Sequence, residues 1–215
     1  MSDRRVTVVD YGAGNLLSVC RALEHVGATV DIAEEGMAVA KAERLVLPGV
    51  GAFGKAMEEL RHRDLVEPIR RLAQSGRPLM GICLGMQLLF EESEEFGQHT
   101  GLGLIGGRVV AIPATGIDGT PHKIPHIGWS AMMPGSPTDW AGSVLEDVAP
   151  GSRMYFVHSF TVSPANPAHR LAVADYDGRT VTAAVACGNV SGFQPHPEKS
   201  AGTGLAILAR FAGRS

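Results

Sequence analysis

Gly81-Ile82-Cys83-Leu84-Gly85 places a cysteine between two glycines where an apolar segment gives way to a helical pattern. This is the cysteine form of a nucleophile elbow, in which the reactive side chain stands on a tight turn between a strand and a helix. Glycines on either side of the turn are needed because a Cβ there would collide with the adjoining chain. The positive end of the helix favours the thiolate, so we expect Cys83 to be an exposed, reactive nucleophile.

A buried structural thiol is the alternative for any cysteine. It fits Cys20, which lies on the apolar stripe of a predicted helix, better than it fits Cys83. Cys187 lies in a Cys-Gly-Asn turn with no evident partner.

A cysteine nucleophile needs a base, and His196 is the candidate among the eight histidines. It lies in Gln194-Pro195-His196-Pro197-Glu198-Lys199-Ser200, whose prolines should keep the backbone extended. Residues two apart in an extended segment project to the same side, so His196 and Glu198 should face together. A carboxylate beside an imidazole fixes its tautomer and completes a triad in the order Cys, His, Glu. A solvated turn is the alternative for this segment on its own.

His122 and His126 have the four-residue spacing of a helical metal pair, but Pro121, Pro125 and Gly128 exclude a helix there. We expect both histidines to lie in a loop. The sequence predicts no metal site.

Two glycine patterns resemble nucleotide-binding loops. Gly49-x-Gly51-x-x-Gly54 follows a predicted strand, but Pro48 precedes it and no acidic residue ends a second strand about 20 residues later. Gly12-x-Gly14 has Leu17 in place of the third glycine. Turns and close backbone approach explain these glycines better, so no cofactor is predicted. A nicotinamide-dependent oxidoreductase remains the alternative, and it would have to bind its cofactor.

The elements that must position these residues follow a regular order over the first ninety residues, where short apolar segments alternate with helical periodicity. Such alternation predicts an α/β fold with a mostly parallel central sheet flanked by helices. The expected strands are residues 6–10, 29–33, 44–47 and 78–82, and the expected helices are residues 16–26, 55–61, 65–74 and 84–90.

The second half predicts an antiparallel extension of that sheet, within a single domain of residues 1–215. Asp177-Gly178 should form a hairpin turn. Residues 113–150 are rich in Gly and Pro and should form ordered loops. The expected strands are residues 153–160, 171–176, 180–186 and 190–194, followed by a helix at residues 203–212.

Composition excludes several function classes. The 215 residues carry 19 Lys plus Arg against 22 Asp plus Glu, and no stretch concentrates the positive charges, so nucleic-acid binding is not expected. No apolar run approaches the roughly 18 residues of a membrane span, and no secretion signal is recognisable. Three cysteines cannot form a disulfide framework, and we expect a cytoplasmic protein with free thiols.

Two motifs add a family resemblance. GICLGMQLLF around Cys83 and HPEKS from His196 resemble the class I, triad-type glutamine amidotransferases. The segments DYGAGNL, LPGVGAF, ESEEFG, HIGW and YFVHSF narrow the resemblance to the glutaminase subunits of imidazole glycerol phosphate synthases, from histidine biosynthesis. The motifs extend from residue 10 to residue 200 and so cover nearly the whole chain.

The resemblance implies roles for individual residues. Cys83 would attack the carboxamide of glutamine, His196 would protonate the departing ammonia, and Glu198 would orient His196. No cofactor is implied. The oxyanion would be held by the Leu84 amide and by one from Gly49, Val50 and Gly51, and glutamine would be contacted by Gln87, Glu95, Ser159 and Phe160.

The resemblance also implies a partner. In this family the ammonia passes to a (β/α)8-barrel cyclase subunit, the heterodimer partner, which forms imidazole glycerol phosphate and an aminoimidazole carboxamide ribotide. Asn15, Trp129, Tyr155 and Lys199 would border that partner. The alternatives are core burial for Trp129 and a solvated charge for Lys199.

Pro195 departs from the family, which usually has Phe before the catalytic histidine. If position 195 lies at a strand end, proline costs little; if the sheet needs its N–H, the chain must bulge and move His196. Two further alternatives are a glutaminase subunit of another synthase, such as the pyridoxal phosphate system, and a catalytically impaired binding partner of the same fold. DYGAGNL and HIGW argue against the first, and the complete triad argues against the second.

Overall fold

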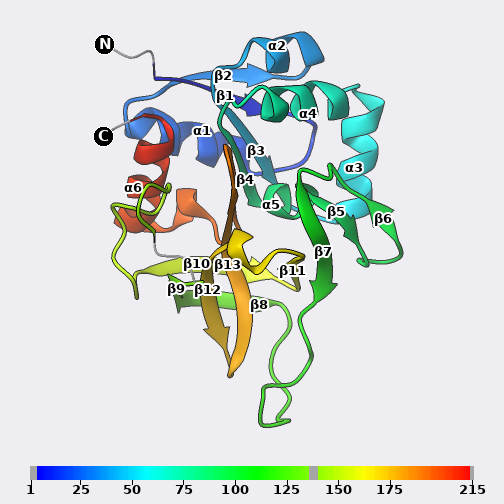
Figure 1. Cartoon of the computed structure of the whole chain (residues 1–215), viewed down its shortest axis with the longest axis vertical. Coiled ribbons are helices and arrows are strands. Elements are labelled where there is room, and N and C mark those ends of the chain that lie inside the picture. Colours follow the sequence, from blue (N-terminus) through cyan, green and yellow to red (C-terminus); the bar gives the residue numbers. More distant parts are fainter. Residues whose placement is uncertain (1–3, 136–139, 214–215) are drawn as a thin grey trace.

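The computed structural model describes residues 4–135 and 140–213, and the strands of this part form three sheets (Figure 1). Most of the strands in the central sheet are rich in Val, Ile, Leu and Ala, as buried sheet positions favour. The strands are β1 (Arg5–Val9), β2 (Thr29–Ala33), β3 (Leu45–Gly49), β4 (Leu79–Cys83), β5 (Phe90–Ser93), β6 (His99–Thr100), β7 (Ile105–Ala111), β8 (His126–Ala131), β9 (Met133–Pro134), β10 (Arg153–His158), β11 (Phe160–Pro164), β12 (Arg170–Tyr176), β13 (Arg179–Cys187) and β14 (Val190–Phe193).

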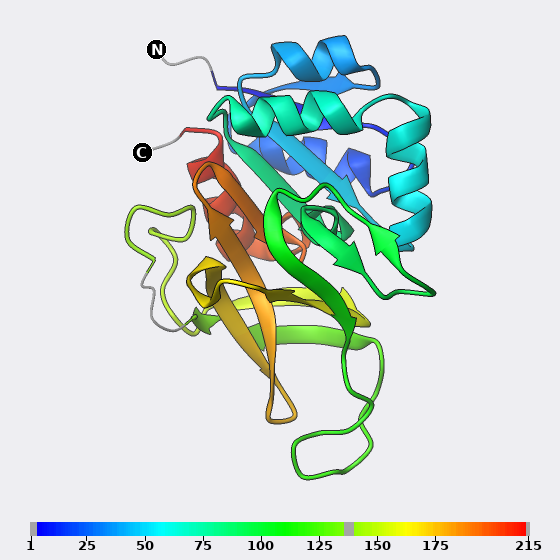
Figure 2. The same ribbon diagram turned by 45° about the vertical axis from the view of Figure 1, so that its right-hand side comes forward.

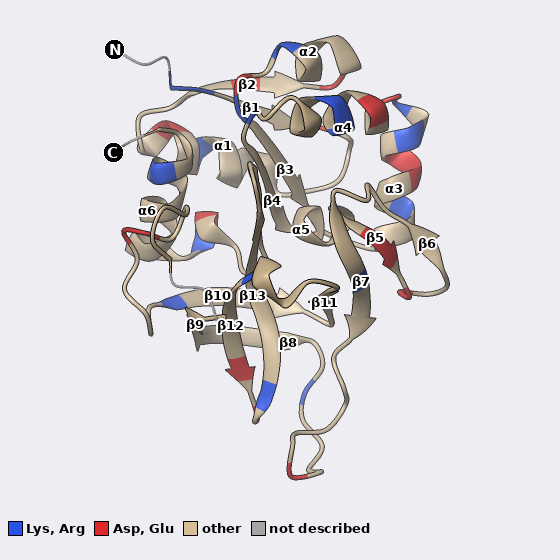
Figure 3. Cartoon of the chain, in the orientation of Figure 1, with Lys and Arg blue, Asp and Glu red and all other residues tan. Residues whose placement is uncertain are grey.

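The outer helices bury one face each and expose the other, whereas the short helix from Leu84 to Leu88 is buried on all sides. In the helix from Val66 to Gln74, for example, Ile69, Leu72 and Ala73 are buried while Glu67 and Arg71 are solvent-facing. Basic and acidic side chains are interspersed over the outer helices (Figure 3). The helices are α1 (Leu16–His25), α2 (Gly36–Lys41), α3 (Phe53–His62), α4 (Val66–Gln74), α5 (Leu84–Leu88) and α6 (Ala201–Phe211), with 3-10 turns η1 (Pro167–His169) and η2 (Pro197–Lys199).

The central sheet has the strand order β2-β1-β3-β4-β14-β13-β12-β9 within the described residues. Neighbouring strands from β2 to β14 in this order run parallel. Those from β14 to β9 run antiparallel. The predicted α/β fold with an antiparallel extension is therefore confirmed.

Helices cover both faces of the parallel part (Figures 1 and 2). Successive strand residues point to opposite faces, so Val8 packs with α1 and α6 while Val9 packs with α3 and α4. In β4, Met80 likewise packs on the face covered by α1 and α6, and Leu79 on the face covered by α3 and α4. The inner strands β3 and β4 are buried on both faces and continuously apolar, which is why the sequence predicted them well.

The antiparallel extension contains the predicted hairpin. Asp177 and Gly178 both have positive φ, as a two-residue turn joining twisted strands requires, and they connect β12 to β13. The prediction of a single strand at residues 153–160 is wrong, because two strands that pair with different neighbours lie there. The first ends at His158 as β10, which pairs with β8, while β11 begins at Phe160 and pairs with β7.

The prediction of loops throughout residues 113–150 is also wrong, because β8 and β9 lie there; residues 136–139 are outside the described residues. The inward-facing positions of β8 are His126, Gly128 and Ser130 instead of apolar residues. An alternating hydrophobic pattern is therefore missing from this strand. His126, which we expected in a loop, is the first residue of β8 and is buried.

The helix predicted at residues 84–90 is shorter. It ends at Leu88, and Phe90 begins β5, which pairs with β7. The sequence pattern predicted neither α2 nor β5 to β7. Apart from β7, these elements have six residues or fewer, and the pairing of the strands is decided by distant residues.

Gly85 controls how closely α5 packs on β3, and this gives a first prediction. A Cβ at Gly85 would lie 1.8 Å from the Leu47 carbonyl oxygen, a backbone atom that cannot move aside. We expect Gly85→Ala to lower the free energy of unfolding by more than about 3 kcal/mol in urea denaturation. Gly202→Ala is the matched control: its Cβ would meet open space in α6, so stability should stay equal or rise by up to about 1 kcal/mol. Equal effects of the two substitutions would contradict this account of the close approach.

Candidate active site

Cys83 occupies the predicted elbow. It ends β4 and precedes α5 with φ 55° and ψ −113°, a conformation that costs energy in any residue with a side chain. A Cβ at Gly81 would lie 2.6 Å from the Gly85 carbonyl oxygen, and one at Gly85 would meet Leu47. Both glycines are thus needed for the steric reason inferred from the sequence. Cys83 is, however, only 8% exposed, so the expectation of an exposed thiol is wrong.

The thiol is reached through a cavity of about 380 Å³ beside the elbow. Pro125, Val157 and His158 also line this cavity, although the sequence interpretation assigned none of them to the site. The residues predicted from the sequence that line it are Val50, Gly51, Cys83, Leu84, Gln87, Glu95, Ser159, Phe160 and His196.

His196 and Glu198 form the predicted pair. The Nδ1–H of His196 donates to Oε1 of Glu198 at 2.8 Å, and the two side chains are 2% and 1% exposed. The backbone N–H of His196 donates to the Tyr155 carbonyl at 3.0 Å, which ties this segment to β10. The extended conformation predicted for the segment is wrong, because Pro197 begins the 3-10 turn η2. Proline suits the first position of such a turn, and the turn brings the carboxylate back to the ring.

The environment of His196 favours its protonated form. Burial alone lowers the pKa of the imidazole, but hydrogen bonding and charge from Cys83 and Glu198 outweigh it and raise the pKa to about 9. Its Nε2 is buried, and His196 lines the cavity together with Cys83. An imidazolium stabilised in this way can hold a proton beside a thiolate.

Gln194 contacts the sulfur, although the sequence interpretation assigned it no role. Its side chain is fully buried, and its Nε2 donates to Cys83 Sγ at 3.8 Å. Its Oε1 accepts a hydrogen bond from Gln87 Nε2 at 3.0 Å. Gln87, on α5, therefore holds the residue that contacts the nucleophile.

The loop after β3 borders the same cavity. Val50 and Gly51 line it, as does Leu84 from the start of α5. Gly51 has φ 108°, which favours glycine. Gly49 instead lies in the packed interior, where a Cβ would be 2.5 Å from Tyr11 Oη and 3.0 Å from the Gly85 nitrogen.

The residues expected to contact glutamine are already held by other groups. Glu95 Oε2 accepts a hydrogen bond of 2.6 Å from the Phe53 N–H, at the start of α3. The Phe160 carbonyl accepts from Gln87 Nε2 at 3.3 Å and from His158 Nδ1 at 2.8 Å. Their orientation at the cavity wall is thus fixed before any ligand binds.

The residues expected at a partner interface lie near the surface. Trp129 and Tyr155 are opposite each other on β8 and β10 and make an edge-to-face contact, with ring centroids 6.2 Å apart. Trp129 is 44% exposed, so the alternative of core burial is wrong. Lys199 is exposed on η2, which contacts α1, and Asn15 is half-buried directly before α1.

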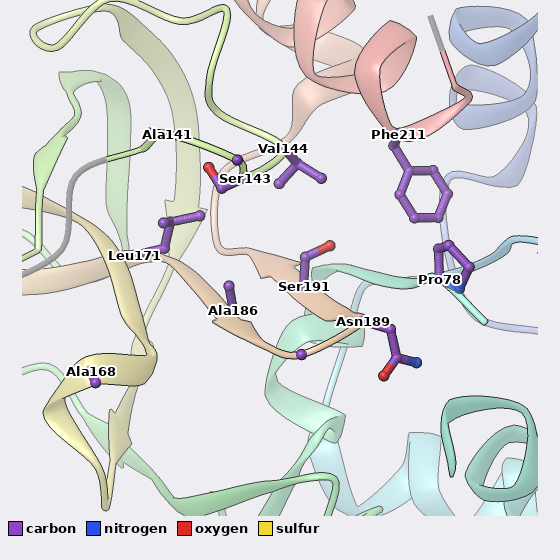
Figure 4. Close-up of a pocket in the computed structure, with 12 residues that line it drawn as sticks. Pro78, Ala141, Ser143, Val144, Ala168, Leu171, Ala186, Asn189, Ser191 and Phe211 are labelled. Carbon is purple, nitrogen blue, oxygen red and sulfur yellow. The ribbon is translucent and has the colours of Figure 1, made fainter. Parts of the chain in front are cut away.

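A larger cavity, of about 650 Å³, lies elsewhere (Figure 4). Pro78 and Asn189 line it and directly precede β4 and β14. The cavity therefore lies where these strands begin, whereas Cys83 lies where β4 ends. Among the residues that the structure describes, no ionisable side chain lines this cavity. Within residues 4–135 and 140–213, no three His, Cys, Asp or Glu side chains are grouped to hold a metal ion, and no helix is long and apolar enough to cross a membrane.

The two buried thiols should differ in reactivity, and this gives a second prediction. Cys20 is also 8% exposed, and burial raises its pKa, with further contributions from Glu24 and Asp10. Cys83 instead has His196 beside it. We expect iodoacetamide near neutral pH to modify Cys83 at least about tenfold faster than Cys20 by peptide mass mapping. His196→Asn should remove most of that difference, and equal rates in the unsubstituted protein would count against a reactive Cys83.

Comparison with known proteins places this chain in a family. Residues 7–213 match the family described as glutamine amidotransferase class-I. The chain is 48% identical to imidazole glycerol phosphate synthase subunit HisH 1 of Legionella pneumophila (strain Lens), over 96% of this chain and 97% of the relative. It is 47% identical to the HisH subunit of Rhodopirellula baltica, over 96% of each chain.

Solved structures share the fold at low sequence identity. The structure of PurLQS from Thermotoga maritima matches with a TM-score of 0.71 at 20% identity, over 97% of this chain and 96% of that chain. A crystal structure of a glutamine amidotransferase matches with a TM-score of 0.72 at 16% identity, over 96% of this chain and 98% of that chain. The chain therefore belongs to the class I glutamine amidotransferases and, among them, to the HisH subunits of imidazole glycerol phosphate synthase.

Proposed function

We propose that this chain hydrolyses glutamine to glutamate and ammonia, with Cys83 as nucleophile, His196 as acid and base, and Glu198 as the carboxylate that orients the imidazole. The observation that carries the proposal is the buried hydrogen bond of 2.8 Å between His196 Nδ1 and Glu198 Oε1. The same histidine lines one cavity with Cys83, the strained cysteine of the elbow. Side chains from two distant segments, Cys83 and the pair His196 and Glu198, come together there, as the acyl-transfer mechanism requires.

The chemistry proceeds in two halves. His196 takes the proton of the Cys83 thiol, and the sulfur attacks the carboxamide carbon to form a tetrahedral oxyanion. The proton passes to the nitrogen, the C–N bond breaks, and ammonia leaves behind a glutamyl thioester. His196 then removes a proton from water, hydroxide attacks the thioester, and the released thiolate regains its proton as glutamate departs.

Backbone amides stabilise the oxyanion in this proposal. The Leu84 N–H and an amide of the Gly49-Val50-Gly51 loop would donate to it. The positive φ of Gly51 supports this assignment, since it allows the neighbouring peptide to turn between a resting orientation and one that faces the oxyanion.

Glutamine binds beside the sulfur in this proposal. Gln87 and Glu95 would contact its α-amino and α-carboxylate groups, and the backbone of Ser159 and Phe160 would complete the subsite. Their fixed positions at the cavity wall support the assignment, because preorganised groups lose little entropy on binding.

Ammonia needs an enclosed route, because in neutral water it is protonated and loses its nucleophilic lone pair. We infer that it passes to a (β/α)8-barrel cyclase partner, which forms imidazole glycerol phosphate and an aminoimidazole carboxamide ribotide, and that Asn15, Trp129, Tyr155 and Lys199 border that partner. The subunit names of the HisH relatives and the exposed, aromatic position of Trp129 support this inference.

Removing the nucleophile gives a third prediction. Cys83→Ala should abolish glutamine hydrolysis while the complex with the cyclase still forms product from added ammonium, since only ammonia production needs the thiol. Cys20→Ala removes a thiol of the hydrophobic core that has no part in the proposed site. This variant should keep both glutamine hydrolysis and product formation from ammonium. Glutaminase activity that survives in Cys83→Ala would rule out the proposed nucleophile.

Pro195 gives a fourth prediction. β14 ends at Phe193, and the Gln194 N–H makes the last backbone hydrogen bond to β13, at Ala183. Pro195 lies beyond this ladder, so its missing N–H costs the sheet nothing. We expect Pro195→Phe to change glutaminase turnover of the complex by less than about tenfold, or about 1.4 kcal/mol in the barrier. A complex that hydrolyses glutamine only after this substitution would instead favour the impaired binding partner.

A further inference from the structure

His158 lines the cavity but has no part in the proposed triad. It is the last residue of β10, and its side chain contacts the backbone of Phe160, two residues later in the chain. Its Nδ1 lies 2.8 Å from the Phe160 carbonyl oxygen. A carbonyl can only accept, so Nδ1 carries the proton and donates it.

A second buried histidine holds this ring. His126 Nδ1 lies 2.9 Å from His158 Nε2, and His126 Nε2 lies 3.0 Å from Ser130 Oγ. Burial lowers the pKa of both imidazoles, that of His158 to about 4, so both are neutral near pH 7. Each neutral ring has one donor and one acceptor, which fixes the direction of the chain: Ser130 donates to His126, His126 to His158, and His158 to Phe160.

Aromatic packing leaves these rings little freedom. The His126 ring stacks on Tyr176 at 4.1 Å and on Phe156 at 5.0 Å between centroids. His126 and His158 are 2% and 6% exposed. A ring held by stacking and by hydrogen bonds on both nitrogens has a single orientation.

The Phe160 peptide depends on this support. Because the Ile112 N–H donates to the Ser159 carbonyl at 2.9 Å, Phe160 and Ala111 form a non-hydrogen-bonded pair of β11 and β7. The N–H and carbonyl of Phe160 therefore point away from β7 and receive no support from the sheet. The carbonyl is held instead by His158 and, at the longer distance of 3.3 Å, by Gln87.

We propose that His158, held by His126, is a positioning residue for the glutamine subsite, which fixes the Ser159–Phe160 backbone against which the amino-acid end of the substrate rests. The inference rests on the proposed glutaminase function. His158 need not touch the reacting atoms, because its effect passes through the Phe160 peptide. Its loss should weaken glutamine binding and leave the chemistry at Cys83 unchanged.

The test is steady-state glutaminase kinetics of the complex with the cyclase for His158→Leu and His158→Asn. Leucine removes the donor and leaves the carbonyl half supported, so the KM for glutamine should rise about tenfold or more while kcat changes less than about threefold. Asparagine places an N–H near the former Nδ1, so it should return KM to within about threefold of the original value. Iodoacetamide modification of Cys83, which needs no glutamine subsite, should keep its rate in both variants.

Two more variants sharpen the result. His126→Leu removes the support of His158 but not its N–H, so it should raise KM by a smaller factor, about threefold, with kcat unchanged. This variant carries the test if His158→Leu fails to fold. His122→Asn is the matched control: His122 bonds to Asp177 and stacks on Tyr176 but does not line the cavity, so KM should not change.

The outcomes separate the two proposals. If the unsubstituted complex hydrolyses glutamine but neither His158→Leu nor His126→Leu changes KM, or if asparagine behaves like leucine, the positioning role is overturned and the glutaminase stands. If kcat falls as far as kcat/KM does, His158 acts in the chemistry, which also overturns the inference. If the unsubstituted complex does not hydrolyse glutamine, the proposed function itself fails and the inference with it.

Discussion

The whole site depends on the contact between the backbone of α5 and the end of β3. Gly85 approaches the Leu47 carbonyl so closely that no Cβ fits between them. Because α5 lies so close to β3, the chain turns sharply at the end of β4, and Cys83 takes up a conformation with positive φ there. The loop that follows β3 carries Val50 and Gly51 into the same cavity. One steric constraint thus positions both the proposed nucleophile and the amides proposed to stabilise its oxyanion.

Burial then makes the polar groups of the site depend on one another. Cys83, Gln194 and His196 are all nearly inaccessible to solvent, and the Glu198 side chain is 1% exposed. In such surroundings a charge is stable only beside an opposite charge or a hydrogen-bond partner. This explains why Cys83 and Glu198 raise the pKa of His196 in spite of its burial. The cavity wall follows the same rule, since Gln87 and His158 both support the Phe160 carbonyl.

The sequence predicted those features that depend on local patterns. The inner parallel strands β3 and β4 are continuously apolar, the elbow has its glycines at fixed positions, and Asp177-Gly178 marks a tight hairpin. Strand β8 was missed because the side chains that it buries are His126 and Ser130, whose role becomes visible only beside His158 on another strand. The turn at Pro197 was also misjudged, since proline fits an extended chain and the first position of a 3-10 turn equally well.

The most direct test of the account is affinity labelling of the complex with a chloroketone analogue of glutamine, which presents an electrophilic carbon where the carboxamide would lie. The account predicts one equivalent of label, located by peptide mass mapping on Cys83. Free glutamine should slow the labelling of the unsubstituted complex. The substitution His196→Asn should slow the labelling even without glutamine. Inactivation of the glutaminase with the label on Cys20 or Cys187, or with Cys83 unlabelled, would contradict the central claim that Cys83 is the nucleophile.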